Sequence, residues 1–342
     1  MFTHPHKQKS WVTGVLALAL LLAALGGLLV GSVNIPPAEA LQKLWAALLG
    51  QGADDAPTRI LLSARLPRLL LAASVGGTLA LAGLASQTLF RNPLATPSII
   101  GVSSGAALGA VIGLLLMGRV GFASPLLASV FSIASGLGVT LLVFALGRRG
   151  RFFGHALLLA GIAIGSLCSS LTTAALYLAG ERLQAIVFWL MGGLWQANWR
   201  DALIMLPLAL GGLAVLRLLA PAMNLALVGE RSAHDLGLNL PRLQRQLLIM
   251  IAVTTAVAVS LTGVIGFIGL VVPHLLRLVL GADHRRLVPA TALGGAVLLV
   301  SADTLARTLA APAEIPVGIL TAMVGAPVFL WLLHRRMGRT LP

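Results

Sequence analysis

The sequence is poor in charge, and this shortage excludes most soluble proteins. Only 10% of its 342 residues are Asp, Glu, Lys or Arg, whereas 58% are hydrophobic. A soluble globular domain carries about 25% charged residues. The single cysteine, Cys168, lies in an apolar run, so a disulfide or a cysteine metal site within the chain is excluded. The composition therefore predicts a membrane protein.

Motifs that carry chemistry are also missing. The three lysines, Lys7, Lys9 and Lys43, lack the glycine-rich turn of a phosphate-binding loop. None of the seven histidines pairs with a carboxylate at metal-ligand spacing. Asp303 is the only carboxylate well inside an apolar run, so the chain lacks the acidic relay of an ion-coupled transporter. We therefore expect no enzyme, no metal site and no cofactor on this chain, and an energy source on another chain.

Long apolar runs, by contrast, are abundant. A spanning helix needs about 20 mostly apolar residues, and such runs predict an all-α polytopic membrane protein with about ten helices in one domain, residues 1–342. The runs are 11–32, 66–90, 98–117, 125–146, 155–178, 202–219, 246–263, 264–280, 288–306 and 317–334. Gly263, Gly266 and Gly269 offer a break between the seventh and eighth runs. The short, tryptophan-rich segment 186–199 is expected at the interface or as a re-entrant segment.

The formal net charge of +14 has two interpretations. Nucleic-acid binding requires basic residues gathered on one face, but here they are scattered singly between the apolar runs. Cytoplasmic loops of membrane proteins are rich in Lys and Arg. Ten crossings with both termini in the cytoplasm place 16 of the 24 basic residues inside and 8 outside, which favours this orientation. The first run of 22 residues favours an uncleaved anchor, since a cleaved signal has an apolar core of about 7–15 residues.

Small residues and one ion pair predict how the helices pack. Glycines four apart at 101, 105 and 109, and at 161 and 165, predict close helix contacts rather than a chemical site. Asp303 and Arg307 are also four residues apart, so they can pair on one helix face near the outer end. A structural ion pair is the favoured interpretation.

The segment "NLALVGERSAHDLGLNLPRLQR", residues 224–245, is long, mixed in polarity and broken by glycine and proline. It predicts two short helices joined by a turn on the cytoplasmic side. A docking element for a partner is favoured over an ordinary solvated loop.

Several stretches together resemble the permease subunits of bacterial ABC importers for iron–siderophore complexes, haem and vitamin B12. They include "RLPRLLLA" (65–72), "GLASQTLFRNPLATPSIIGVSSGAALG" (83–109), "LALVGERSAHDLGLN" (225–239), "GFIGLVVPHLLRLVLGADHRRLVP" (266–289) and "EIPVGILTAMVGAPVFLWLL" (314–333). They occur in family order over nearly the whole chain. The resemblance implies the type II ABC importer permease fold.

The resemblance also implies partners. Two permease copies, as a homodimer, would enclose a pore in the bacterial inner membrane. Two ATP-binding subunits, which hold ATP and magnesium, would dock at about 224–245. A periplasmic binding protein would deliver an iron chelate, either a ferric siderophore or haem. Cobalamin is the alternative substrate within the family. An ion-coupled secondary transporter and a scaffold protein are the alternatives from other classes.

Individual residues acquire roles only from this resemblance. Arg65, Arg68 and Arg307 match arginines that meet acidic residues of the binding protein, and we expect them on the outer surface. The matching ATPase contacts are Gly229, Glu230, Ala233, Leu236 and Gly237. Gly154 and His155 occupy the place of the cytoplasmic gate, where the family often has small hydroxyl residues. His155 is expected to pack there, and an imidazole–haem contact is the alternative.

Overall fold

The computed structural model describes residues 11–31, 33, 35–50, 55–120, 125–148 and 153–337, and the described residues contain helices and no strand. The first half contains α1 (Trp11–Leu29), α2 (Pro37–Leu48), α3 (Ala56–Arg59), a π-helical segment (Ile60–Arg65), α4 (Leu66–Leu89), a 3₁₀ turn (Pro97–Ile100), α5 (Val102–Val120), α6 (Pro125–Gly147) and α7 (Phe153–Tyr177). The second half contains a 3₁₀ turn (Gly180–Arg182), α8 (Leu183–Leu190), α9 (Trp199–Ala226), α10 (Glu230–Asp235), α11 (Leu240–Thr262), α12 (Ile268–Leu280), α13 (His284–Thr308) and α14 (Val317–Met337).

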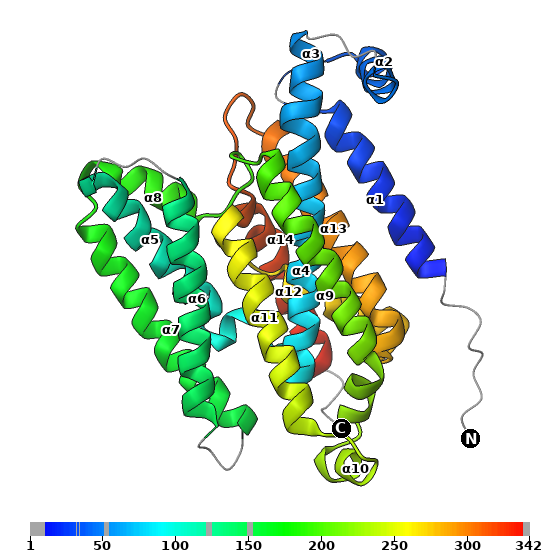
Figure 1. Ribbon diagram of the computed structural model, residues 1–342. Helices are drawn as coiled ribbons and strands as arrows, with labels where there is room; N and C mark the ends of the chain where they lie inside the picture. The colour runs from blue at the N-terminus through cyan, green and yellow to red at the C-terminus, as the bar shows by residue number, and fades with distance from the viewer. Residues whose placement is uncertain are drawn as a thin grey trace.

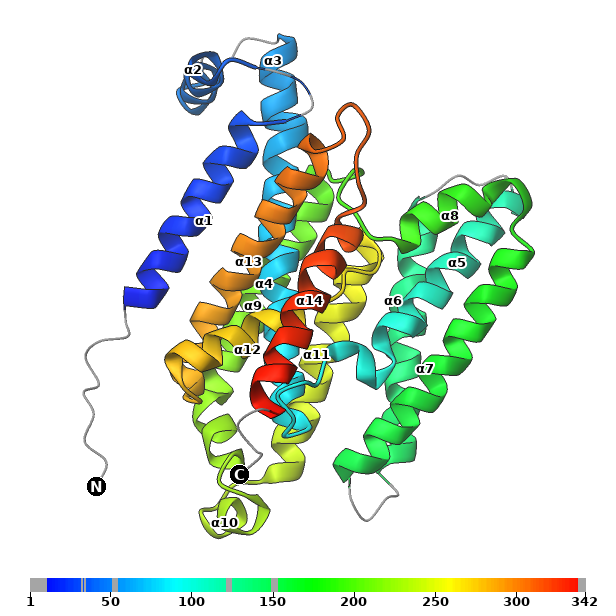
Figure 2. The same cartoon turned by 180° about the vertical axis from the view of Figure 1, so that it is seen from behind.

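Helices α1, α9, α11, α12 and α13 pack around α4, and helices α5, α6 and α7 form a group at the side of α11 (Figures 1 and 2). Helices α2, α3 and α8 lie at one end, which we call the outer end, and α10 lies at the opposite, inner end. Helix α1 begins and α14 ends toward the inner end. The chain termini themselves, whose cytoplasmic placement was predicted, lie outside the described residues.

The prediction of about ten membrane segments is confirmed, with revised bounds. Within the part of the chain that the structure describes, seven helices are long and apolar enough to span a membrane, and three shorter apolar helices, within α5, α12 and α14, bring the number to ten. The second span begins ten residues earlier than predicted, because α3, the π-helical segment and α4 form one helix over residues 56–89. Polar residues near the start of this helix interrupt the apolar run, so the sequence did not predict where the helix begins. Most of α4 is buried on all sides, which its many Gly, Ala and Ser residues permit.

The stretch 246–280 breaks where its glycines predicted. Helix α11 ends at Thr262, Gly263 has a positive φ of 68°, and α12 begins only at Ile268. Thirteen residues rise about 20 Å, which is less than the ~30 Å of a bilayer core. The helix of the eighth span therefore covers about two thirds of the core, and the non-helical segment 263–267 precedes it. Non-helical backbone at this depth is tolerated where protein surrounds it.

Backbone contacts at glycines pack the segment between α11 and α12 against its neighbours. The Gly193 N–H donates to the Thr262 carbonyl at 2.8 Å, and the Gly318 N–H donates to the Gly192 carbonyl at 3.2 Å. A Cβ on Gly263 would lie 2.2 Å from the Trp189 carbonyl oxygen. Three backbone segments thus meet without intervening side chains: the loop after α8, the α11–α12 break and the start of α14.

The predicted glycine packing is confirmed in α5 and α7. A Cβ on Gly109 would lie 2.2 Å from the Phe131 carbonyl oxygen of α6, and a Cβ on Gly161 would lie 2.0 Å from the Ile99 carbonyl oxygen. Gly101 differs from the prediction, because it ends the 3₁₀ turn with a φ of 80° rather than lying on the helix face. Only glycine permits these approaches of one backbone to another.

Two shorter segments are also settled. The tryptophan-rich segment forms the eight-residue helix α8 and a loop at the outer end, as expected for a segment that does not cross. Segment 224–245 holds one short helix, α10, rather than the two predicted. The second helix was wrong because Leu240 already begins α11, whose first turn is capped by the Asn239 side chain.

The helix contact at Gly109 can be tested by adding a methyl group. Gly109→Ala should destabilise the chain by about 1–3 kcal/mol, because overpacking forces α5 away from α6. Gly138→Ala on α6 is the matched control, since a Cβ there meets nothing within 4 Å. The measurement is the fraction of monodisperse protein after heating in detergent. Equal losses in both variants would contradict the contact.

Candidate functional site

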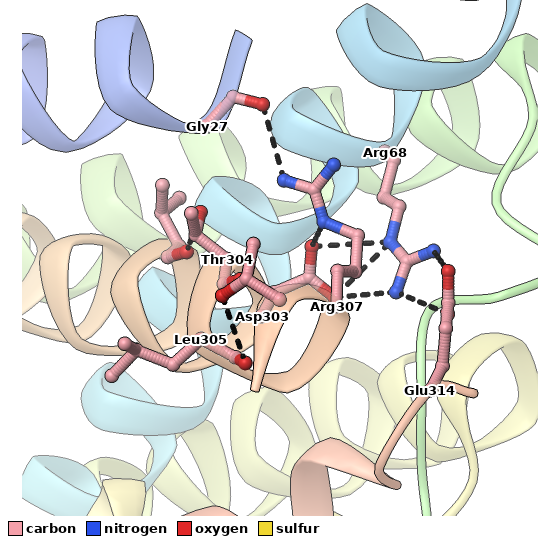
Figure 3. A network of polar contacts seen from close by, with 9 residues as sticks. Gly27, Arg68, Asp303, Thr304, Leu305, Arg307 and Glu314 are labelled. Carbon is pink, nitrogen blue, oxygen red and sulfur yellow. Dashed lines mark hydrogen bonds and ion pairs between the residues drawn. The ribbon is translucent and has the colours of Figure 1, made fainter. Parts of the chain in front are cut away.

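The outer end holds a cluster of buried ion pairs around Asp303 of α13 (Figure 3). The Arg68 guanidinium from α4 donates to the Asp303 carboxylate, with its Nε 3.1 Å from both carboxylate oxygens and its Nη2 2.9 Å from Oδ1. Arg307, one turn further along α13, places its Nε 3.3 Å from Oδ2. Arg68 also pairs with Glu314 of the α13–α14 loop at 2.9 Å. The predicted Asp303–Arg307 ion pair is confirmed, and Arg68 is its unforeseen third member.

Of the three arginines predicted to meet a binding protein, Arg65 and Arg307 also bind the end of α1. Arg65 donates from Nη1 to the carbonyls of Leu28 at 2.6 Å and Leu29 at 3.2 Å, and from Nη2 to the Val33 carbonyl. Arg307 donates to the Gly27 carbonyl at 3.1 Å (Figure 3). The last carbonyls of a helix lack intrahelical partners and carry partial negative charge, so cations stabilise them.

The expected exposure of these arginines is wrong. Arg65 and Arg307 are only 5% and 7% exposed, and the Arg68 side chain is 11% exposed. Each is held by an acceptor within the chain, which is what burial of a guanidinium requires. Their contact with a binding protein stays a prediction. Glu314, whose side chain is 26% exposed, is the member of the cluster nearest the surface.

The inner end presents α10 as an exposed knob. Gly229 and Gly237 flank it with φ values of 110° and 81°, conformations that favour glycine. Glu230 and Leu236 are exposed, and their contact with an ATPase subunit stays a prediction. Ala233 is fully buried, so it supports α10 from below rather than offering a contact surface. Sequence reasoning missed Leu227 and Val228, which are 48% and 61% exposed beside α10.

A polar network ties α10's neighbours together. Glu230 of α10 pairs with Arg91, just beyond α4, at 3.1 Å. His284 at the start of α13 lies 2.9 Å from the Thr88 hydroxyl of α4 and 2.8 Å from the Asn224 side-chain oxygen of α9. Three helices therefore meet within hydrogen-bonding distance next to the knob.

Asp283, in the loop before α13, completes this network. The Asn224 amide donates to its carboxylate at 2.7 Å. Burial by itself raises the pKa of Asp283, but the hydrogen bonds from Asn224 and from the Arg285 backbone, with the charges of Arg286 and Arg285, produce a net lowering of that pKa. The carboxylate is therefore ionised at neutral pH and holds Asn224 in place.

Helix α7 carries an exposed stripe, which we call the α7 stripe. Its members are all exposed and recur at three- and four-residue spacing, apart from the adjacent Ser169 and Ser170; they are His155, Leu159, Ile162, Ser166, Ser169, Ser170, Thr173 and Tyr177. Hydroxyls in the middle of a spanning helix are poorly suited to face lipid alone. His155 lies at the inner end of this stripe, and Gly154 has no neighbour within 4 Å of an added Cβ. Their gate role stays a prediction.

A groove of about 470 Å³ runs beside the α7 stripe. Four hydroxyls line it, from Ser98, Ser104, Ser166 and Ser169, together with apolar and glycine positions. The Ser98 hydroxyl lies 2.7 Å from that of Thr96. No Asp, Glu, Lys or Arg lines this groove. The groove therefore offers hydroxyl groups for hydrogen bonds. Among the described residues, no three His, Cys, Asp or Glu side chains are grouped so that they could hold a metal ion.

The sequence of this chain is similar to those of known transport proteins. The family described as the FecCD transport family matches residues 16–335. The haemin transport system permease protein HmuU of Yersinia pestis is 43% identical over 335 residues, covering 96% of this chain and 97% of that protein. The cobalamin import system permease protein BtuC of Halobacterium salinarum is 43% identical over 314 residues, covering 89% and 81%.

A solved structure supports the same relationship. It is described as an inward-facing conformation of a transporter assigned to the metal-chelate type of ABC transporter. It matches with a TM-score of 0.83 and 33% identity, covering 95% of this chain and 99% of that one. The likeness therefore extends over the whole bundle, including both ends described above.

The outer cluster can be tested at its carboxylate. Asp303→Asn should destabilise the chain by about 3–5 kcal/mol, because it leaves two buried guanidiniums without their shared counter-ion. Glu314→Gln should cost less, since this partly exposed carboxylate pairs with Arg68 alone. Apparent unfolding temperatures in detergent measure both. Equal shifts would show that Asp303 does not hold the cluster.

Proposed function

Because the chain belongs to the FecCD transport family, the permease subunits of ABC importers, we propose that it forms half of a pore for an iron chelate. The substrate, a ferric siderophore or haem, would pass from periplasm to cytoplasm across the inner membrane. The match to the haemin permease over 96% of the chain is the observation that carries this proposal. Cobalamin is the second candidate, because a cobalamin permease is equally identical, at 43%.

The pore would form between two copies of this chain. The α7 stripe is exposed in the single chain, and its central hydroxyls are poorly matched to hydrocarbon. Ser169 and Thr173 already donate to the carbonyls of Gly165 and Ser169. Two stripes facing each other across water would give the hydroxyls of the stripe further hydrogen-bond partners. The adjoining groove has no charged lining. A large chelate would therefore form only weak hydrogen bonds there and would not bind tightly during its passage.

Energy would enter at the inner end. In this family ATP hydrolysis lies on a separate subunit. The polar helix α10, with the exposed apolar side chains of Leu227, Val228 and Leu236 beside it, offers a contact surface for that subunit. A push on this knob would reach α4 through the Arg91–Glu230 pair and α13 through Asn224 and His284. At the outer end, a periplasmic binding protein would meet the loop that carries Glu314, which Arg68 holds in place.

The substrate can be tested by reconstitution. Proteoliposomes would hold this chain with its ATPase subunit, and the cognate binding protein would be loaded in turn with haemin, a ferric siderophore or cobalamin. We expect ATP-dependent uptake of an iron chelate and little uptake of cobalamin. Uptake of cobalamin alone would favour the second candidate. Uptake driven by a proton gradient without the ATPase subunit would refute the ABC mechanism.

The docking surface can be tested at Leu236. Leu236→Asp places a charge on an apolar side chain that is 61% exposed, and a desolvated, unpaired charge at an interface costs several kcal/mol. We expect the ATPase subunit to be lost on co-purification and transport to fall at least about tenfold, for about 1.4 kcal/mol or more. Leu236→Met is the control and should retain both. Normal co-purification of the Asp variant would exclude this side chain from the contact.

A further inference from the structure

A cavity of about 710 Å³ lies at the outer end and belongs to none of the surfaces above. It is bounded by the outer parts of α6, α9 and α11, and by α8 with the loop that follows it. Figure 1 shows α11 between α6 and α9, with α8 across the outer end. The volume lies within the range of about 300–1,000 Å³ for small-molecule sites.

The inner part of the cavity is apolar and open to the side of the bundle. Its lining here includes Val130 and Ile133 from α6, Ile204 from α9, and Val257 and Leu261 from α11. The hydroxyls of Ser129 and Ser260, which also line the cavity, both donate to backbone carbonyls. Val130 and Ile204 are 57% and 43% exposed. Exposed aliphatic side chains on spanning helices face hydrocarbon. The opening between α6 and α9 therefore admits a ligand from the lipid.

The outer rim of the cavity is cationic and aromatic. Arg182 and Arg200 are both exposed there, and Trp189 and Trp195 line the same space. Trp is enriched where membrane helices meet the headgroup level. Apolar depth beneath a rim of Arg and Trp is the polarity profile of a phospholipid, with its headgroup outward and its chains inward.

Local contacts hold this rim in place. The Trp195 ring lies 4.3 Å from the Phe188 ring, centroid to centroid. It also packs over Gly193, where a Cβ would lie 1.5 Å from the ring. One Nη of Arg182 donates to the Leu114 carbonyl at 3.2 Å, and a guanidinium has five N–H donors. The rim is thus already shaped before any ligand enters.

The charges of the rim select the headgroup. Arg182 and Arg200 contribute two positive charges and Asp201 one negative charge, which leaves +1. The Asn198 amide donates to the Asp201 carboxylate at 2.8 Å, so this acid has a partner within the chain. A headgroup with one net negative charge neutralises the site, whereas a zwitterionic headgroup does not.

We propose that the cavity binds one anionic phospholipid of the phosphatidylglycerol type. Its phosphodiester lies between Arg182 and Arg200, and its acyl chains run along the apolar walls on α6, α9 and α11. Guanidinium groups bind phosphate with directed, charge-assisted hydrogen bonds. The cavity lies between α6 and α9, whereas the proposed pore surface lies on α7. The proposal therefore does not depend on the transported substrate.

Tryptophan fluorescence provides the test, because Trp189 and Trp195 lie in the cavity. The full chain is placed in phosphatidylcholine vesicles that contain a small fixed fraction of phosphatidylglycerol with brominated acyl chains. Vesicles with the same fraction of brominated phosphatidylcholine measure quenching by bulk lipid. We expect extra quenching by phosphatidylglycerol, corresponding to about tenfold enrichment in the cavity, or about 1.4 kcal/mol.

Variants assign the extra quenching to the cavity. Arg182→Gln with Arg200→Gln should remove it, and Arg200→Gln alone should reduce it. Trp189→Phe with Trp195→Phe should remove the signal while both arginines remain. Arg217→Gln with Arg242→Gln is the matched control, because both arginines are exposed and lie outside the cavity. Size-exclusion profiles check that each variant is folded.

Several results would overturn the proposal. Equal quenching by the two brominated lipids in the wild type would show no selective site. Extra quenching that survives in the double arginine variant would exclude the cationic rim. A preference for brominated phosphatidylethanolamine over phosphatidylglycerol would refute the charge argument. Loss of quenching in the control variant would mean that net protein charge, not the cavity, attracts the lipid.

Discussion

The structure depends above all on the neutralisation of Asp303. A carboxylate and two guanidiniums in an apolar bundle are each costly alone, and only their mutual contacts make their burial tolerable. Arg68 brings α4 to this centre, Arg307 extends it to the end of α1, and Glu314 draws in the α13–α14 loop. The outer ends of three helices and one loop are therefore fixed by a single charged group. The remaining helix contacts use shape rather than charge, because lipid tails compete with any purely apolar contact.

The inner end is organised differently. Helix α10 is joined to α9 and α11 through glycines with positive φ, and the ion pair that it makes with Arg91 is exposed, although the nearby Thr88–His284 contact is buried. This ion pair is weaker than the buried cluster, since exposed ion pairs contribute about 0–1 kcal/mol. The exposed helix α10 can therefore move at a smaller cost than the buried cluster at the outer end. This asymmetry suits an importer that receives its energy from below.

Much of this arrangement was predictable from the sequence. Apolar run length identified the membrane segments, the glycines marked the α11–α12 break, and the spacing of Asp303 and Arg307 identified their pair. Three features were not predictable. The start of the second helix was hidden because Arg59 and Arg65 interrupt the apolar pattern, although α1 carbonyls satisfy Arg65. The burial of Arg68 depends on Asp303, 235 residues away. Leu227 and Val228 look like the end of a span until α9 is seen to stop at Ala226.

The connection of α10 to its two neighbours has a consequence for the whole molecule. Helices α9 and α11 begin or end beside this short helix and also supply two sides of the outer cavity. The 28 residues of α9 extend about 42 Å, so the two locations are opposite ends of the same levers. A tilt of these levers at the cytoplasmic face must change the width of the gap at the far face. The lipid bound in the outer cavity and the nucleotide cycle at the inner end would then be mechanically coupled through α9 and α11.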